Sequence, residues 1–275
     1  AVGPAVHEFG WDWDDVNRLA AAGIAGHLIE CGAQVTGGMY SRWTPDLSLH
    51  DVGYPIAELA EDGGAVVTKP PGTGGTVTIG TVSEQLVYEI GDPAHYLTPD
   101  VDADFTGVTL ADEGPDRVRV SGAAGNPAPD RYKVSLAYRD GYMVSGTLVV
   151  AGPNAREKAR VCAEIIERRL ERAGCLPAHL NTELLGGGDV VPGVSPAIDA
   201  PEIVLRMSAR DASRDTLERF SREFAPLVTS GPPGVTGYTG PRPKPHPVLA
   251  YWPTTIARER VSADVTVKTA REWTA

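Results

Sequence analysis

A histidine, a carboxylate and a thiol lie close together near the end of a predicted helix. His27, Glu30 and Cys31 have the spacing i, i+3 and i+4, so the helix places all three side chains on one face. Such a group could supply acid–base chemistry, a nucleophile or three metal ligands. The sequence places no fourth metal ligand, and a helix C-terminus disfavours the thiolate form of Cys31. The alternative is a buried thiol beside a histidine–glutamate hydrogen bond.

A polar and glycine-rich segment directly after this helix is expected to contact a substrate. It contributes an amide, a hydroxyl and glycines, whose backbone N–H groups could hold an oxygen atom that gains negative charge. These expected substrate-binding residues are Gln34, Thr36, Gly37 and Gly38.

Acidic, aromatic and imidazole side chains gather again between Glu84 and Asp100. Glu84 and His95 are candidate acid–base residues, and Tyr96 and Asp100 are candidate substrate contacts. The functional interpretation is a substrate-positioning loop that holds a general base. The alternative, given the flanking prolines, is a set of side chains that form turn hydrogen bonds.

Two further segments are candidates for ligand binding. Lys69, Gly74 and Gly75 belong to a stretch whose backbone N–H groups could form an anion-binding nest. This stretch lacks the terminal Lys-Ser/Thr of a P-loop, and a plain turn is the simpler interpretation. His7 precedes Trp11-Asp-Trp13 and is expected just after a strand end, where ligands gather in open α/β sheets.

A basic, proline-rich stretch lies towards the end of the chain. Arg242, Lys244 and His246 alternate with prolines and could clamp an anion or form an exposed basic loop. They belong to a glycine- and proline-rich loop at 230–247, which is long for a compact domain. A loop of this length indicates a functional segment or partial disorder.

The composition limits the classes of partner. The 275 residues include 25 Lys and Arg against 36 Asp and Glu, and the net charge of -11 argues against a general nucleic-acid binder. No apolar run approaches the ~18–20 residues of a membrane span. The 3 cysteines include no C-x-x-C pair, and the first residues do not form a signal peptide. We therefore expect reduced thiols and a cytoplasmic protein with neither nucleic-acid nor membrane partners.

The elements that must position these residues predict an α/β fold with a mixed β-sheet flanked by helices. A helix over 14–31 carries the first cluster, and a helix over 83–90 begins the second. Residues 101–150 indicate a β-rich middle segment, with a hairpin turn predicted at Arg139-Asp-Gly-Tyr142.

A C-terminal strand–helix–strand unit is expected to follow. Its predicted elements are a helix over 154–173, a strand over 202–208, a helix over 213–224 and a final strand pair that includes 261–267. We divide the chain into a first α/β portion, 1–150, and a C-terminal α/β portion, 151–275, which form one continuous structural unit.

Several longer stretches resemble the AtuA-like family, named for acyclic terpene utilisation. Their length and their order, from the first residues to about Val261, argue against chance matching. The matching stretches are His7-Glu-Phe-Gly-Trp, Ala25-Gly-His-Leu-Ile-Glu-Cys-Gly-Ala-Gln, Gly53-Tyr-Pro-Ile-Ala-Glu, Gly72-Thr-Gly-Gly, Glu84-Gln-Leu-Val-Tyr-Glu-Ile-Gly-Asp-Pro, Tyr96-Leu-Thr-Pro-Asp-Val and Ser230-Gly-Pro-Pro-Gly-Val-Thr-Gly-Tyr.

The resemblance implies a bacterial, cytoplasmic protein of branched or isoprenoid acyl metabolism, found alongside acyl-CoA carboxylases and hydratases. Its substrate would be of the coenzyme A type, with no further cofactor implied. Family members carry an additional N-terminal half before the His7 region, so we expect a partner chain or segment that supplies it, and an oligomer. The resemblance assigns no catalytic residue.

A lyase or hydratase acting on an acyl thioester or a related carboxylate fits these candidates best. His27 or His95 would exchange a proton alpha to a carbonyl, oriented by Glu30 and Glu84, while glycine N–H groups stabilise the enolate oxygen. This model places the loops at 69–76 and 91–100 and the helix end at 30–38 around one pocket. The alternatives are an accessory subunit of a carboxylase-type assembly and a tailoring enzyme of secondary metabolism.

Overall fold

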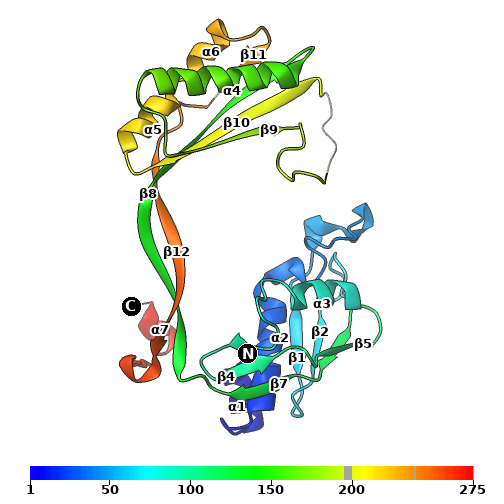
Figure 1. Cartoon of the computed structure of the whole chain (residues 1–275). Coiled ribbons are helices and arrows are strands. Elements are labelled where there is room, and N and C mark those ends of the chain that lie inside the picture. The colour runs from blue at the N-terminus through cyan, green and yellow to red at the C-terminus, as the bar shows by residue number, and fades with distance from the viewer. Residues whose placement is uncertain (195–199, 238–239, 275) are drawn as a thin grey trace. The chain divides into compact units, whose positions relative to one another are not determined.

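The chain forms two compact units. The computed structural model describes residues 1–194, 200–237 and 240–274. Unit 1 comprises Ala1–Val134 with Pro253–Ala275, and unit 2 comprises Ser135–Trp252. Both units combine helices with β-sheets (Figure 1), which confirms the α/β class. The division of the chain at residue 150 remains a prediction.

Unit 1 is built around the helix predicted over 14–31. This helix, α2 (Val16–Glu30), begins where the side chain of Asp15 accepts a hydrogen bond from the backbone N–H of Arg18 at 3.3 Å. Its apolar face, which includes Leu19, Ile24 and Leu28, is fully buried. The preceding helix α1 (Val2–Phe9) was not expected. The strand end predicted beside His7 is wrong, because His7 lies in the last turn of α1.

Two antiparallel sheets complete the core of unit 1. The first has the order β1 (Ile56–Leu59), β2 (Ala65–Thr68), β6 (Val118–Ser121) and β5 (Thr109–Asp112). The second has the order β3 (Tyr96–Leu97), β4 (Val101–Asp104) and β7 (Ala124–Pro127). Helix α3 (Ile79–Leu86) packs against α2 and begins with a capping box formed by Thr78 and Thr81.

Short helical segments lie outside these layers. They are η1 (Gly32–Gln34), η2 (Pro45–Leu47), η3 (Leu49–Asp51), η4 (Arg258–Arg260) and α7 (Ala270–Trp273). The strand predicted over 261–267 is wrong, since the backbone is irregular there and Val265 and Val267 are exposed. No strand pairs with this segment among the described residues, so its alternating apolar side chains are not buried.

Unit 2 is a five-stranded sheet covered by helices. Strands β11 (Val235–Thr236), β8 (Arg131–Ala151), β10 (Glu202–Asp211) and β9 (His179–Leu185) follow one another in the sheet, and β12 (His246–Ala257) also pairs with β8. Helix α4 (Ala155–Arg172) lies across one face of this sheet (Figure 1) and matches the helix predicted over 154–173. The helix predicted over 213–224 is shorter, α5 (Arg214–Ser221), and α6 (Phe224–Ser230) follows it.

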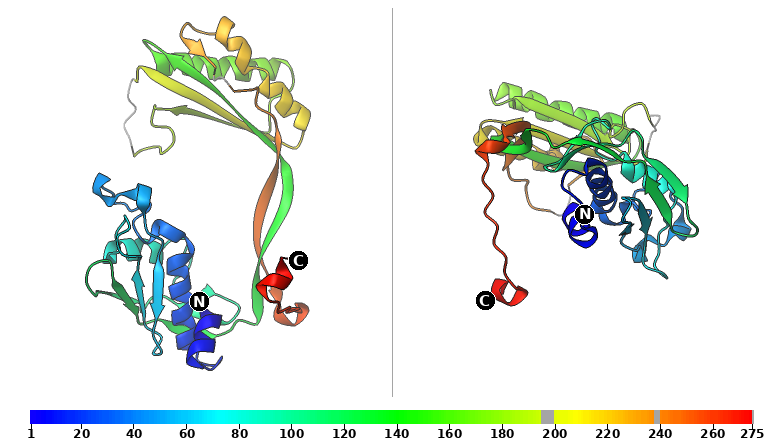
Figure 2. Two further views of the ribbon diagram at one scale, coloured as in Figure 1. Left: turned by 180° about the vertical axis from the view of Figure 1, so that it is seen from behind. Right: turned by 90° about the horizontal axis from the view of Figure 1, so that it is seen from below.

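The hairpin predicted at Arg139-Asp-Gly-Tyr142 is wrong. Strand β8 continues through this point without reversing (Figures 1 and 2), and its second half pairs with β10 from Tyr142↔Asp211 to Ala151↔Glu202. The long hydrogen-bond ladder with β10 and a salt bridge between Asp140 and Arg210 make the continuous strand more stable than a local turn. Gly141 retains a positive φ of 75°, and a Cβ there would lie 2.7 Å from the carbonyl oxygen of Asp211.

Among the described residues, no helix combines the length and the apolar character needed to cross a lipid bilayer.

Candidate functional site

Two members of the group that the sequence singles out first, His27 and Glu30, form a hydrogen-bonded cluster with Gln85, and we call these three residues the His27 cluster. The ring of His27 is 3% exposed, in the last turn of α2. Its Nδ1 lies 2.7 Å from Oε1 of Glu30, and its Nε2 lies 2.9 Å from the carbonyl oxygen of Gln85. The side-chain amide of Gln85 donates in return to the carbonyl oxygen of His27 at 3.1 Å. The cluster therefore joins the C-terminal turns of α2 and α3.

Both ring nitrogens of His27 are engaged by the chain itself. A carbonyl oxygen only accepts, so Nε2 donates the hydrogen bond to Gln85, and Nδ1 faces the carboxylate of Glu30. Tyr96 and Phe105 pack on the ring, with centroids 5.8 and 5.6 Å away. Burial raises the pKa of Tyr96 above its usual value. This surrounding matches the histidine–glutamate alternative given by the sequence.

The segment after α2 contacts the glycine-rich loop through its backbone. Thr36 is buried and donates from Oγ1 to the carbonyl oxygen of Gly53 at 2.6 Å, while its own carbonyl accepts from the N–H of Thr76 at 2.8 Å. The N–H groups of Gly37 and Gly38 donate to the carbonyls of Gln34 and Ala33. Cys31 and Gln34 are partly buried at this turn. The two segments are thus connected mainly by hydrogen bonds that involve backbone groups.

The backbone N–H groups expected to form an anion-binding nest donate hydrogen bonds to carbonyl oxygens of the chain. Gly74 donates to the carbonyl oxygen of Asp51 at 2.7 Å, and Gly75 donates to that of Leu47 at 2.6 Å. Buried Lys69 spans the loop from inside, with Nζ 2.8 Å from the carbonyl oxygen of Thr73 and 3.1 Å from a carboxylate oxygen of Asp116. This geometry fits a plain turn better than an anion-binding nest.

The remaining candidates form separate surface contacts. Both carboxylate oxygens of Glu84 accept from the backbone N–H of Ser41. The backbone N–H of Asp100 donates to Oγ1 of Thr98 in the turn between β3 and β4. His7 is exposed on α1. Tyr96, in the loop at 91–100, packs on the ring of His27.

His95 forms an exposed pair with Asp102. Its Nδ1 lies 2.9 Å from Oδ2 of that carboxylate. The hydrogen bond to Asp102 and the charge of this carboxylate raise the pKa of His95 above its usual 6.5. The pair lies on strand β4 and the turn before β3, so it stabilises a surface turn.

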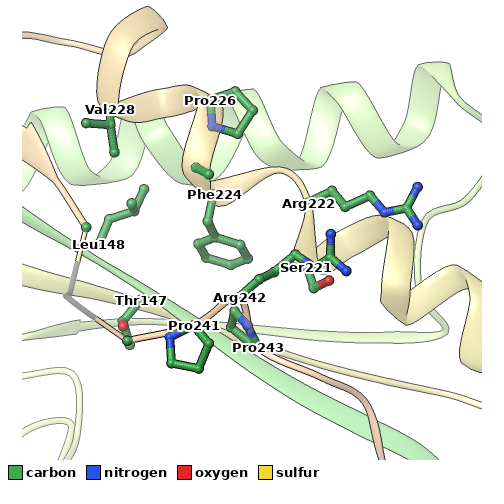
Figure 3. A pocket seen from close by; sticks show the side chains of 13 residues that line it. Thr147, Leu148, Ser221, Arg222, Phe224, Pro226, Val228, Pro241, Arg242 and Pro243 are labelled. Atoms are coloured by element: carbon green, nitrogen blue, oxygen red, sulfur yellow. The ribbon is translucent and has the colours of Figure 1, made fainter.

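Four pockets on the described part of the chain have volumes of 210 to 610 Å³, and none of them is lined by the unit 1 candidates described above. The pocket of 610 Å³ belongs to unit 2 and lies between strand β8, the α5–α6 turn and the loop before β12 (Figure 3). We call it the unit 2 pocket. Its lining residues are Thr147, Leu148, Ser221, Arg222, Phe224, Ala225, Pro226, Val228, Gly237, Gly240, Pro241, Arg242 and Pro243.

The unit 2 pocket is apolar on one side and cationic on the other. In Figure 3, Leu148 and Val228 lie on one side of the Phe224 ring, and the guanidinium groups of Arg222 and Arg242 lie on the other. From the sequence, Arg242 is part of either an anion clamp or an exposed basic loop, and its loop is either functional or partly disordered. The sequence carries no signal for the lining residues of β8, the α5–α6 turn and α6, because they are ordinary members of a strand and of two helices.

Comparisons with known proteins give one match. The model of the family described as acyclic terpene utilisation family protein AtuA matches residues 1–267. No curated protein and no solved structure matches the chain.

Proposed function

Because the chain belongs to the acyclic terpene utilisation family, we propose that it binds an acyclic isoprenoid acyl compound in the unit 2 pocket. The observation that carries this proposal is the pocket itself. Its volume of 610 Å³ lies in the range of about 300–1,000 Å³ that is usual for small-molecule sites. A flexible apolar chain of the length of an acyclic terpene fits such a volume.

The lining supports binding through apolar contact. Leu148, Phe224 and Val228 supply aliphatic and aromatic surface, and Pro226 and Pro241 add rigid walls. Each methylene group that such a surface removes from water contributes about 0.8 kcal/mol. The lining includes neither a carboxylate nor an imidazole nor a thiol, so the pocket's own side chains favour binding over proton transfer.

The test is a calorimetric titration of the protein with straight-chain acids of increasing length. We expect the affinity to rise up to about fourfold for each added methylene, until the chain fills the pocket. Val228→Ser removes apolar surface from the pocket and should weaken binding of every acid. Val161→Ser is the matched control, since Val161 lies on α4 outside the pocket and is 38% exposed against 44% for Val228. Affinity that is independent of chain length, or an equal loss in both variants, contradicts the proposal.

A second candidate function is the lyase or hydratase reaction on an acyl-CoA-like substrate. The observation in its favour is the His27–Glu30 pair, a buried imidazole held 2.7 Å from a carboxylate that is 49% exposed. Glu30 reaches solvent and could pass a proton between a substrate and the ring.

Deuterium exchange separates this candidate from simple binding. The protein is incubated with an acyl thioester in deuterated water, and mass spectrometry measures deuterium at the carbon alpha to the carbonyl. The reaction predicts exchange that disappears in Glu30→Gln and persists in Glu8→Gln, a control on the exposed surface of α1. Exchange no faster than without protein contradicts the reaction and leaves the binding proposal in place.

A further inference from the structure

We infer that Arg222 and Arg242 form an anion-recognition site at one side of the unit 2 pocket, so that the pocket selects an acyl chain bearing an anionic group over a neutral molecule of the same length. This inference rests on the proposed function and adds the charge of the ligand to it. The charge comes from a carboxylate at the end of the chain or from the phosphates of a thioester carrier.

The two guanidinium groups are available for a ligand. No salt bridge among the described residues involves Arg222 or Arg242, whereas three other arginines of unit 2 are paired, namely Arg169, Arg214 and Arg219. Glu223 follows Arg222 directly, yet its buried carboxylate is engaged by Arg219 at 2.6 Å and by Arg169 at 3.6 Å. The nearest carboxylate in sequence is therefore occupied by other cations.

The chemistry of the guanidinium group suits an anionic ligand. Arg222 and Arg242 are both exposed to solvent. A guanidinium group forms paired hydrogen bonds with a carboxylate or a phosphate, and it is weakly hydrated for a cation. Two of them beside an apolar wall are therefore complementary to an amphipathic anion.

The backbone also holds Arg242 in place. It stands between Pro241 and Pro243, and both prolines line the pocket. A proline has a fixed φ, and the residue before a proline is restricted to extended conformations. Binding therefore orders little additional backbone at this position, which lowers the entropic cost of recognition.

The side chains divide the ligand into two parts. In Figure 3 the Arg242 side chain extends towards Ser221, and the Phe224 ring separates this region from Leu148 and Val228. An anionic group beside the arginines places its apolar chain along Phe224 towards Val228. The arginines then determine which molecules bind, and the apolar wall determines how long their chains are.

Calorimetric titration with octanoate, octanoyl-CoA and octan-1-ol tests the inference. We expect an octanoate affinity about tenfold or more above that of octan-1-ol, and a decline of the octanoate affinity with added NaCl. Arg222→Gln and Arg242→Gln should each remove most of this preference by lowering the octanoate affinity far more than the octan-1-ol affinity. Arg168→Gln is the control, because it removes one positive charge from the exposed face of α4. Circular dichroism and the thermal midpoint verify that each variant is folded.

The outcomes separate the two proposals. Equal affinity for octanoate and octan-1-ol, or a preference that survives in both arginine variants, overturns the anion site and leaves the apolar pocket. Failure of all three compounds to bind overturns both the anion site and the proposed function. Where the anion site holds, a higher affinity for octanoyl-CoA than for octanoate identifies the carrier phosphates as the recognised group, and the reverse order identifies the free carboxylate.

Discussion

The His27 cluster in unit 1 and the unit 2 pocket use their charged side chains in opposite ways. In the cluster, both nitrogens of His27 are bonded to the chain, one to Glu30 and the other to the carbonyl of Gln85. In the pocket, Arg222 and Arg242 form no salt bridge within the described residues. The first arrangement stabilises the fold, and the second remains open to a ligand. Density of reactive residue types along a sequence therefore does not by itself locate a binding site.

The largest effect expected from this comparison is a loss of stability at the cluster. His27→Ala removes one hydrogen bond to the carbonyl oxygen of Gln85 and opens a cavity between α2 and α3, and it should lower the free energy of unfolding by about 2–4 kcal/mol. Urea denaturation measures this loss. His27→Gln, which can still donate a hydrogen bond, should lose less. Octanoate binding by the folded fraction should be unchanged in both variants, and its disappearance would move the ligand site into unit 1.

A smaller loss is expected at the glycine-rich loop. Lys69→Met keeps the buried aliphatic stem and removes the contacts to Thr73 and Asp116. It should lower the free energy of unfolding by about 1–2 kcal/mol, since Asp116 is partly exposed and is rehydrated. If the loop were an anion nest, this variant would instead weaken octanoate or octanoyl-CoA binding at constant stability.

The smallest effect is expected at His95, and it depends on pH. The folded state raises the pKa of His95 above 6.5 through Asp102, so the stabilisation is fully present below about pH 6.5 and is lost as the pH rises through the folded value. The thermal midpoint of His95→Gln should therefore fall below that of the unaltered protein at about pH 6 and coincide with it at about pH 9. A difference of constant size at both pH values would exclude a role for the charged ring.

The sequence predicted the parts of the structure that depend on local patterns. The long amphipathic pattern of α4 and the apolar face of α2 predicted both helices closely. The predictions that failed depend on distant partners. The Asp-Gly pair at 140–141 favours a turn locally, yet pairing with β10 extends β8 through it. Residues 261–267 alternate like a strand, but no neighbouring strand pairs with them.

The candidate site shows the same limit. The spacing of His27 and Glu30 predicted their contact, because one helix turn determines it. The contact with Gln85 rather than Glu84 depends on the packing of α3 against α2. In the unit 2 pocket, the alternation of Arg242 with prolines made it a candidate from the sequence alone. Phe224 and Val228 could not be predicted as pocket residues, because only the tertiary fold brings α6 to the loop before β12. The partner segment expected before residue 1 remains a prediction.

The central claim is that an acyl chain binds in unit 2 beside α6 and the loop before β12. A photoreactive analogue of octanoate, with a diazirine near the end of its chain, tests it most directly. After irradiation, proteolysis and mass spectrometry identify the labelled peptide. We predict a label within 221–243, which is lost in the presence of excess octanoate and reduced in Arg242→Gln. A label within 27–38 or 84–105, competed by octanoate, would place the ligand at the His27 cluster and contradict the account.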